Sequence, residues 1–131
     1  MLKLNLIMYG GRGQSIGISK RIPDVSNVTV SDNKIYNFYL NESQKHFLNF
    51  QQVGYTKEDG ELLRKDMLEG LKNNEVHEYI REKTGYQKAV VFMKLGKTEK
   101  KQFKTIWGKK KEDKYYTNVS AYRYSEKRKK W

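Results

Sequence analysis

Hydrophobic residues in the first two thirds of the chain recur at the spacing of helices. Phe47, Phe50 and Val53 lie three positions apart and so share one face of a helical segment. Asn41 precedes this run as a suitable N-cap, and Gly54 follows it where a helix often closes in the left-handed conformation. The spacing therefore predicts a first helix between Asn41 and Gly54.

A second helix is predicted after Thr56, whose hydroxyl is a suitable N-cap. Glu58 and Asp59 follow in the first turn, where the helix dipole favours negative charge. Asn73-Asn74 breaks the pattern. The apolar stripe of this helix consists of Leu62, Leu63, Met67, Leu68 and Leu71.

Two further segments have shorter patterns. Val76, Tyr79 and Ile80 predict a third, short helix that ends at Thr84-Gly85. Residues 34–40 fit either a strand or a first helical turn, and the sequence does not decide between the two.

After Gly85 the hydrophobic period changes from 3.6 to 2, which is typical of strands. Residues 86–95, 102–107 and 115–124 are predicted strands, separated by a turn at 96–98 and a lysine-rich turn at 108–113. The fold class expected is therefore α+β, with two or three N-terminal helices packed on a C-terminal antiparallel β-meander of three to four strands.

The N-terminal residues look different. Residues 2–8 alternate as a short strand or an arm, and the next segment holds four glycines in eight residues, from Gly10 to Gly17. No Lys-Ser/Thr pair follows these glycines, so a linker is favoured over a phosphate-binding loop. Residues 28–30 fit a short strand. We expect a flexible, Gly-rich, basic arm at 1–33, an α+β domain at 34–125 and a basic tail at 126–131.

The charge of the chain adds a candidate partner. The 131 residues include 27 Lys and Arg against 15 Asp and Glu, a net charge of +12. Fourteen of these cations but only four acids lie between Lys94 and Trp131. Such a concentrated field favours phosphate backbones, although a basic surface also serves solubility alone. A nucleic acid, RNA in particular, is the expected partner.

Other classes of protein are disfavoured. The chain has no Cys, which excludes disulfides and thiolate metal sites. The opening residues are too short and too polar for a signal peptide or a membrane span, so we expect an intracellular protein without a membrane partner. No Asp/Glu pair is suited to a metal, and no motif indicates a cofactor, so none of either is expected.

The residues that could support metal-free RNA cleavage are few. His46 is the best acid/base candidate because imidazole titrates near neutral pH, though it also fits a surface position on a basic helix. Lys45 and Arg123 are candidates for neutralising the phosphate, and Ser120 and Tyr122 share one face of a predicted strand.

A second group is predicted to hold the nucleic acid by charge and stacking. Trp107 in particular fits either a stacked base or the core. The group consists of Thr105, Trp107, Lys109, Lys110, Lys111, Tyr116, Lys127 and Arg128.

Two stretches resemble known families. The opening residues 1–13, with their Leu-Asn-Leu run and Gly-Gly-Arg-Gly tract, resemble the start of structural and head-associated proteins of phages. Residues 34–123 resemble small toxin and phage nucleases of the barnase–EndoU–colicin–RelE superfamily. The segments that carry this second resemblance are Leu40-Asn41, Lys45-His46, Phe50, Gly54-Tyr55-Thr56, Thr105-Ile106-Trp107 and Asn118 to Tyr122.

The resemblance implies a toxin-like, metal-independent endoribonuclease of a phage or mobile element, with an immunity protein or a phage head protein as its protein partner. It also implies action in the cytoplasm of a bacterial host, or association with the virion. The alternative is a non-catalytic phage accessory or virion protein that binds nucleic acid or a host nucleic-acid-binding protein.

Overall fold

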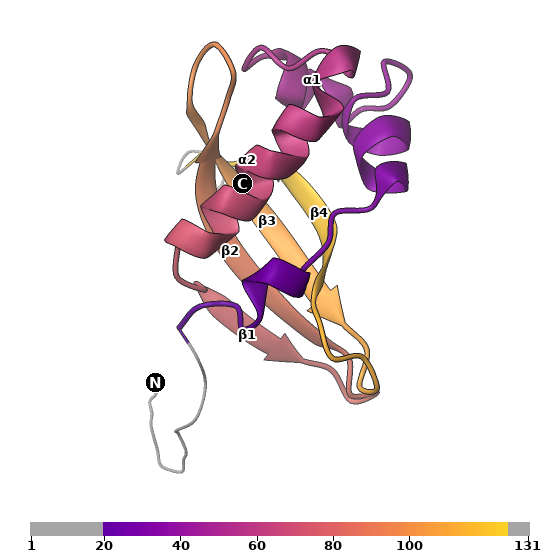
Figure 1. Cartoon of the computed structure of the whole chain (residues 1–131), viewed down its shortest axis with the longest axis vertical. Helices are drawn as coiled ribbons and strands as arrows, with labels where there is room; N and C mark the ends of the chain where they lie inside the picture. Colours follow the sequence, from indigo (N-terminus) through magenta and orange to yellow (C-terminus); the bar gives the residue numbers. More distant parts are fainter. Residues whose placement is uncertain (1–19, 126–131) are drawn as a thin grey trace.

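Residues 20–125 are described by the computed structural model, in which helices cover one face of a four-stranded antiparallel sheet (Figure 1). The predicted α+β fold class is confirmed. In chain order the elements are η1 (Val25–Asn27), η2 (Asn33–Tyr39), α1 (Phe47–Gln51), η3 (Lys57–Asp59), α2 (Gly60–Asn73), β1 (Glu78–Arg81), β2 (Gln87–Leu95), β3 (Lys101–Lys109) and β4 (Thr117–Arg123).

The sheet is a meander with the strand order β1-β2-β3-β4. Its longest ladder joins β2 to β3, from Gln87 opposite Lys109 to Leu95 opposite Lys101. Successive side chains of a strand point to opposite faces of the sheet. The register therefore shows, for each residue of the two central strands, which of the two faces its side chain occupies. One irregularity, between Ile106 and Trp107, shifts the register of β3 against β4.

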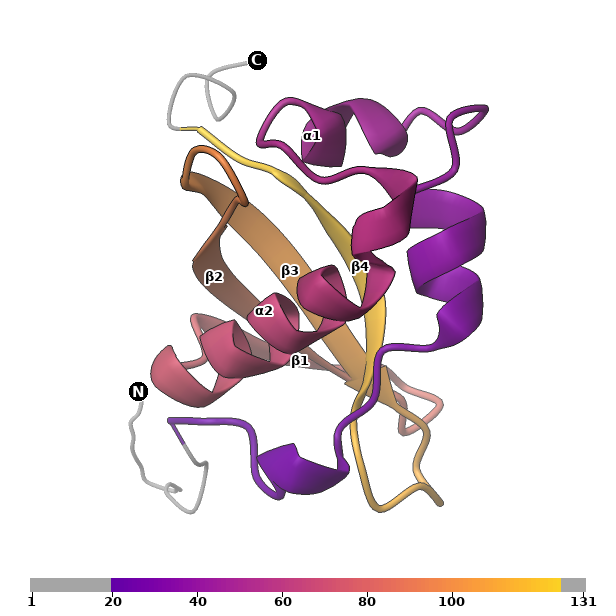
Figure 2. The same ribbon diagram turned by 45° about the horizontal axis from the view of Figure 1, so that its top comes forward.

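The core lies between α2 and the sheet (Figure 2). Leu63, Met67 and Leu71 of α2 are fully buried, whereas Leu62 and Leu68 of the predicted stripe stay partly exposed. Burial of each large apolar side chain contributes about 1.5–3 kcal/mol. The residues of β2 and β3 buried in the same cluster are Ala89, Val91, Met93, Leu95, Phe103 and Trp107.

The helix ends agree with the prediction in part. Thr56 forms a capping box with Asp59, which accepts a hydrogen bond from the Thr56 N–H at 2.8 Å. Gly54 has φ +97°, as expected for a residue that closes α1. Asn41 does not cap α1, which begins only at Phe47; its side chain accepts the N–H of Ser43 at 3.0 Å in a local turn.

The predicted third helix is wrong. Residues 78–81 form β1, which pairs with β2 from Glu78 opposite Val90 to Arg81 opposite Gln87. The spacing of Val76 and Tyr79 fits a helical turn, yet both side chains pack on the core from an extended chain. Pairing with β2 decides the conformation, because a run this short carries no distinct period of its own.

The domain begins earlier than the predicted boundary at residue 34. Ile22, Val28 and Val30 are buried in the same core as the helices. Thr29, in the predicted short strand, forms an isolated parallel bridge with Thr117 of β4. The described part of the predicted arm thus belongs to the domain, whereas its first 19 residues and the predicted tail lie outside the described residues.

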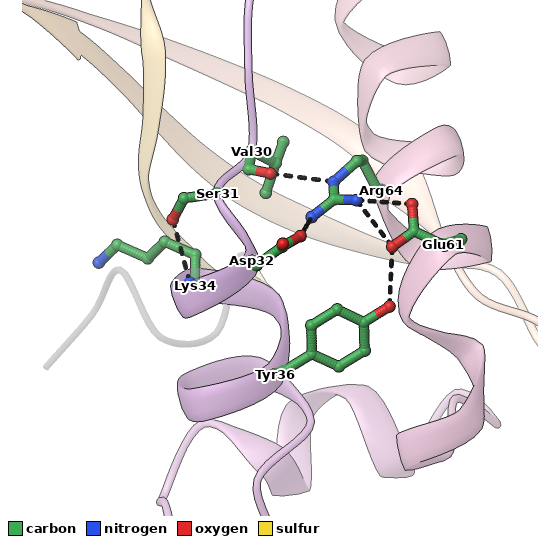
Figure 3. Close-up of polar contacts among 7 residues, drawn as sticks. All are labelled: Val30, Ser31, Asp32, Lys34, Tyr36, Glu61 and Arg64. Atoms are coloured by element: carbon green, nitrogen blue, oxygen red, sulfur yellow. Dashed lines mark hydrogen bonds and ion pairs between the residues drawn. The ribbon is translucent and has the colours of Figure 1, made fainter.

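A polar cluster ties this N-terminal segment to α2 (Figure 3). The Arg64 guanidinium donates to the Val30 carbonyl at 2.9 Å and forms ion pairs with Asp32 and Glu61. The Tyr36 hydroxyl donates to Glu61 at 2.7 Å. These bonds, first that of Tyr36 and then that of Arg64, lower the pKa of Glu61. The cluster joins η2 to α2 and is satisfied within the protein.

Two polar side chains are buried in the sheet, and both are hydrogen-bonded. The Thr105 hydroxyl donates to the Val91 carbonyl at 2.7 Å and accepts the Trp107 indole N–H at 2.8 Å. Asn118 accepts the Tyr39 hydroxyl. Since an unpaired buried polar group is costly, these bonds fix which side chains can occupy the core.

We expect Thr105→Val to lower the free energy of unfolding by about 1–3 kcal/mol, because the Trp107 N–H would stay buried without an acceptor. The measurement is urea unfolding followed by circular dichroism, with Thr117→Val at an exposed position as the control. The penalty should shrink when Trp107→Phe removes the N–H as well. A stability equal to that of wild type in Thr105→Val would show that the hydroxyl is not the required acceptor.

We also expect Tyr36→Phe to weaken the dependence of stability on pH. A carboxyl group whose pKa is lowered by folding stabilises the fold above its unfolded pKa of about 4.3, and this contribution is lost as the pH falls. In the variant the pKa of Glu61 rises towards its ordinary value, so the melting temperature should fall less between pH 6 and pH 3 than in wild type. Tyr115→Phe, at an exposed tyrosine, is the control. An unchanged pH profile in Tyr36→Phe would contradict the coupling.

Candidate functional site

The face of the sheet opposite α2 carries no helix among the described residues, as the ribbon shows from two directions (Figures 1 and 2). We call it the bare face. Its members follow from the strand register, because they alternate with the buried residues of each strand. The side chains that it carries are Glu78, Ile80, Lys88, Val90, Phe92, Lys94, Gln102, Lys104, Ile106, Thr117, Ser120, Tyr122 and Tyr124, of which Val90 is buried.

Aromatic rings gather on the bare face. The Phe92 ring lies 4.9 Å from the Tyr124 ring and 5.0 Å from the His77 ring, measured between centroids. The three residues come from β2, from the segment after β4 and from the segment before β1. Phe92 and Tyr124 are half-buried and His77 is exposed, so the cluster presents ring surface to solvent.

Cations flank these rings. Lys104 lies directly between Phe92 of β2 and Tyr122 of β4 in the strand register. Lys94 is exposed two residues after Phe92, at the next position of β2 on the bare face. Lys88 differs from both because its ammonium pairs with Glu82 at 3.1 Å. Within residues 20–125, neither Lys94 nor Lys104 forms an ion pair. Aromatic surface beside such ammonium groups is the combination that contacts bases and phosphates of a single strand.

A pocket of about 540 Å³ opens beside the bare face. Phe92, Lys94 and Gln102 line it from the sheet. From α2 and the residue after it come carboxylates and amides, which can accept and donate hydrogen bonds at a base edge. These are Asp66, Glu69, Asn73 and Asn74.

The other end of the bare face contains a close approach at Gly108. A Cβ at this position would lie 2.3 Å from the Tyr86 hydroxyl oxygen and 3.0 Å from a Val119 methyl group. Only glycine therefore lets the Tyr86 side chain lie over β3 here. Tyr86 extends the aromatic surface towards the turn between β1 and β2.

The predicted catalytic residues are divided by the sheet. Ser120 and Tyr122 lie on the bare face, opposite Ile106 and Lys104. His46 lies on the helix side, with its ring 6.4 Å from the ring of the buried Tyr39. The structure therefore does not bring His46 together with Ser120 and Tyr122.

Lys45 and Arg123 also belong to the helix side. Lys45 is exposed in the turn before α1. Arg123 is opposite Phe103, a core residue, and its guanidinium donates to Gln52 at 2.9 Å. Sequence reasoning placed Arg123 with Lys45 as a candidate for neutralising the phosphate beside Tyr122, but adjacent residues of a strand point to opposite faces.

Three predicted nucleic-acid contacts are wrong because their side chains are buried. Thr105 and Trp107 are fully buried, and Tyr116 is 3% exposed. The indole of Trp107 faces the helices in the same row as Phe103 and Thr105. A buried ring offers no surface on which a base can stack, so of the two alternatives for Trp107 the core is the one observed.

The predicted lysines have mixed positions. The Lys109 ammonium lies 5.9 Å from the centroid of the Tyr116 ring, on the helix side. Lys110 and Lys111 are exposed in the loop between β3 and β4. Lys127 and Arg128 lie outside the described residues.

Sequence reasoning did not place Phe92, Lys104 or His77 in the site. A signal for Phe92 and Lys104 was present, because each occupies the position that alternates with buried residues of its strand. No comparable signal marked His77, because its place depends on β1 being a strand. Of the predicted catalytic residues, Ser120 and Tyr122 are the two that lie on the bare face.

Residues 20–125 meet neither the requirements of a metal site nor those of a membrane-spanning helix. In that range no group of three or more His, Cys, Asp or Glu side chains is placed to hold a metal ion. None of the helices there combines the length and the apolar character needed to cross a bilayer.

Comparison with known proteins gives one match. The family model described as a domain of unknown function (DUF6883) matches residues 21–125. Its first matched residue agrees with the early start of the folded domain. Neither a curated protein nor a solved structure matches the chain.

Proposed function

We propose that this chain, which belongs to the DUF6883 family, binds single-stranded RNA across the bare face of its sheet. The observation that carries the proposal is the aromatic cluster of His77, Phe92 and Tyr124 beside Lys94 and Lys104. No helix among the described residues covers this face of the sheet, and the three rings do not belong to the core cluster on the other side. Bases of an unpaired strand can stack on such rings while the lysines contact phosphates.

A single strand fits this surface better than a duplex does. Stacking on Phe92 or Tyr124 requires a base whose face is free, which a duplex does not offer. The pocket of about 540 Å³ beside Phe92 has carboxylates and amides for the edge of such a base. Duplex grooves are instead entered by a helix or a two-stranded ribbon, whereas the bare face is one side of a four-stranded sheet.

A second proposal is that the bound RNA is cleaved without a metal ion. The observation that favours it is the position of Tyr122, opposite Lys104 and two residues from Ser120 on the same face. In the proposed reaction the 2′-oxygen attacks phosphorus as its proton passes to a base, and the 5′-oxygen leaves with a proton from an acid. Tyr122 is the proposed proton-transfer group, with water at the other reacting oxygen, and Lys104 stabilises the charge on the phosphoryl oxygens.

The order of helices followed by an antiparallel meander, implied by the nuclease resemblance, supports this second proposal. A toxin-like role in a phage or mobile element stays a prediction from the sequence. So do an immunity or phage head protein as partner, and a place in the host cytoplasm or the virion.

For RNA binding, we expect Phe92→Leu and Tyr124→Leu each to weaken binding of a 12-residue oligouridine about tenfold, because each removes a stacking ring worth about 1–3 kcal/mol. The measurement is fluorescence anisotropy. Tyr115→Leu is the matched control, because Tyr115 is 39% exposed in the β3–β4 loop and is not a member of the bare face. Lys104→Gln should also reduce the slope of log affinity against log salt by about 0.7. Equal affinities in wild type and both ring variants would rule out the bare face as the binding surface.

For cleavage, we expect purified protein in EDTA to convert RNA to fragments with 2′,3′-cyclic phosphate ends and to leave a 2′-deoxy substrate intact. Tyr122→Phe should lower the rate by about 10²–10⁴, the usual contribution of a proton-transfer group. His46→Ala is the matched control, since His46 lies on the helix side. Intact RNA together with normal binding would identify a non-catalytic RNA-binding protein. Loss of activity in His46→Ala would instead show that the catalytic site lies on the helix side of the sheet.

A further inference from the structure

A small pocket lies at one end of the sheet, between the β1–β2 turn and the β3–β4 loop. These two segments lie side by side at the lower right in both ribbon views (Figures 1 and 2). The pocket has a volume of about 200 Å³. We call it the basic turn pocket, and its lining residues are Arg81, Lys83, Thr84, Gly85, Gln87 and Lys111.

The lining is cationic. Three of the six lining residues are Arg or Lys and none is acidic. Within residues 20–125, no carboxylate forms an ion pair with Arg81, Lys83 or Lys111. The nearby acid Glu82 pairs with Lys88 at 3.1 Å, and the Asp113 carboxylate accepts the Lys110 N–H at 3.3 Å. The positive charge of the pocket is therefore not neutralised by its surroundings.

The backbone brings these cations together. Gly85 has φ +93°, and its N–H donates to the Glu82 carbonyl at 2.9 Å in a tight turn. A Cβ at Gly85 would lie 3.0 Å from the Lys111 Cβ, so the Lys111 stem packs directly on the glycine. This contact holds the loop against the turn and keeps the Lys111 ammonium on the same side as Arg81 and Lys83.

The chemistry of the pocket favours a phosphate with two negative charges. A guanidinium and two ammonium groups provide only donors, and the Thr84 hydroxyl and the Gln87 amide add neutral ones. A phosphomonoester carries a charge of about −1.5 to −2 at neutral pH and three free oxygens, whereas a backbone diester carries one charge. Three converging cations match the monoester.

The pocket adjoins the bare face only at the end of the sheet: Arg81 and Gln87 point to the helix side, where Gln87 accepts the Tyr116 hydroxyl, whereas Tyr86 points to the bare face. Tyr86 directly follows Gly85 of the pocket, and its hydroxyl lies over Gly108 on the bare face. We infer that the basic turn pocket binds the terminal phosphomonoester of an RNA strand whose bases lie on the bare face and whose end passes around the β1–β2 turn. This inference rests on the proposed RNA binding, and it assigns the recognised part of the RNA to a strand end.

The test compares oligouridines of eight residues that carry a 5′-phosphate, a 3′-phosphate or neither. A 2′-O-methyl backbone prevents cleavage, so binding to the full chain is measured alone by fluorescence anisotropy. We expect one of the two phosphorylated strands to bind about tenfold more tightly than the unphosphorylated strand, and the better one identifies the recognised end. Arg81→Gln with Lys111→Gln should abolish this preference. Lys57→Gln with Lys72→Gln removes the same charge elsewhere and should leave the preference intact.

The outcomes separate this inference from the proposed function. Equal binding of all three strands, still dependent on Phe92, would overturn the pocket and leave RNA binding in place. A preference that survives in Arg81→Gln with Lys111→Gln would also overturn it. If none of the three oligouridines binds, both the proposed RNA binding and the recognition of an RNA end are overturned. Titration with inorganic phosphate, followed by the Gly85 amide resonance, then shows whether the pocket takes free phosphate instead: a shift in wild type and none in the double variant.

Discussion

The packing of α2 onto alternate residues of β2 is the interaction on which the rest of the structure depends. Leu63, Met67 and Leu71 bury their side chains against Ala89, Val91, Met93 and Leu95, which all point to one side of the strand. Once β2 is oriented in this way, the antiparallel register assigns a face to every residue of β1, β3 and β4. The bare face is the direct consequence, because its side chains are those that the same register directs away from α2.

This constraint explains why neighbouring residues of β3 lie on opposite faces of the sheet. Trp107 and Thr105 bond to each other inside the core, while Lys104 and Ile106, each one position away, point to the opposite face. Tyr122 and Arg123 are separated in the same manner. A nucleic-acid site on one face of this sheet must therefore combine residues of several strands. Within each strand it can include residues two positions apart but not two adjacent residues.

The bare face and the basic turn pocket complement each other chemically. The face offers rings and two ammonium groups that form no ion pair with the described residues, which suit bases and diester phosphates. The pocket offers three cations around a glycine turn. Gly108 and Gly85 serve the same purpose in both places, because each allows a longer side chain, Tyr86 or Lys111, to lie directly on the backbone. The arrangement suits a strand held along its bases and fixed at one end.

The sequence by itself determined the fold class, the Thr56 cap, the body of α2 and the three long strands, because their periods and caps are local. It also located the excess of positive charge late in the chain. Only the tertiary structure decided that residues 78–81 pair as β1, that Ile22, Val28 and Val30 join the core, and that His46 lies across the sheet from Tyr122. The physical reason is that strand pairing and burial are contacts between residues far apart in the chain. A period of two predicts that the side chains of a strand alternate, but which set faces the helices depends on what packs against it.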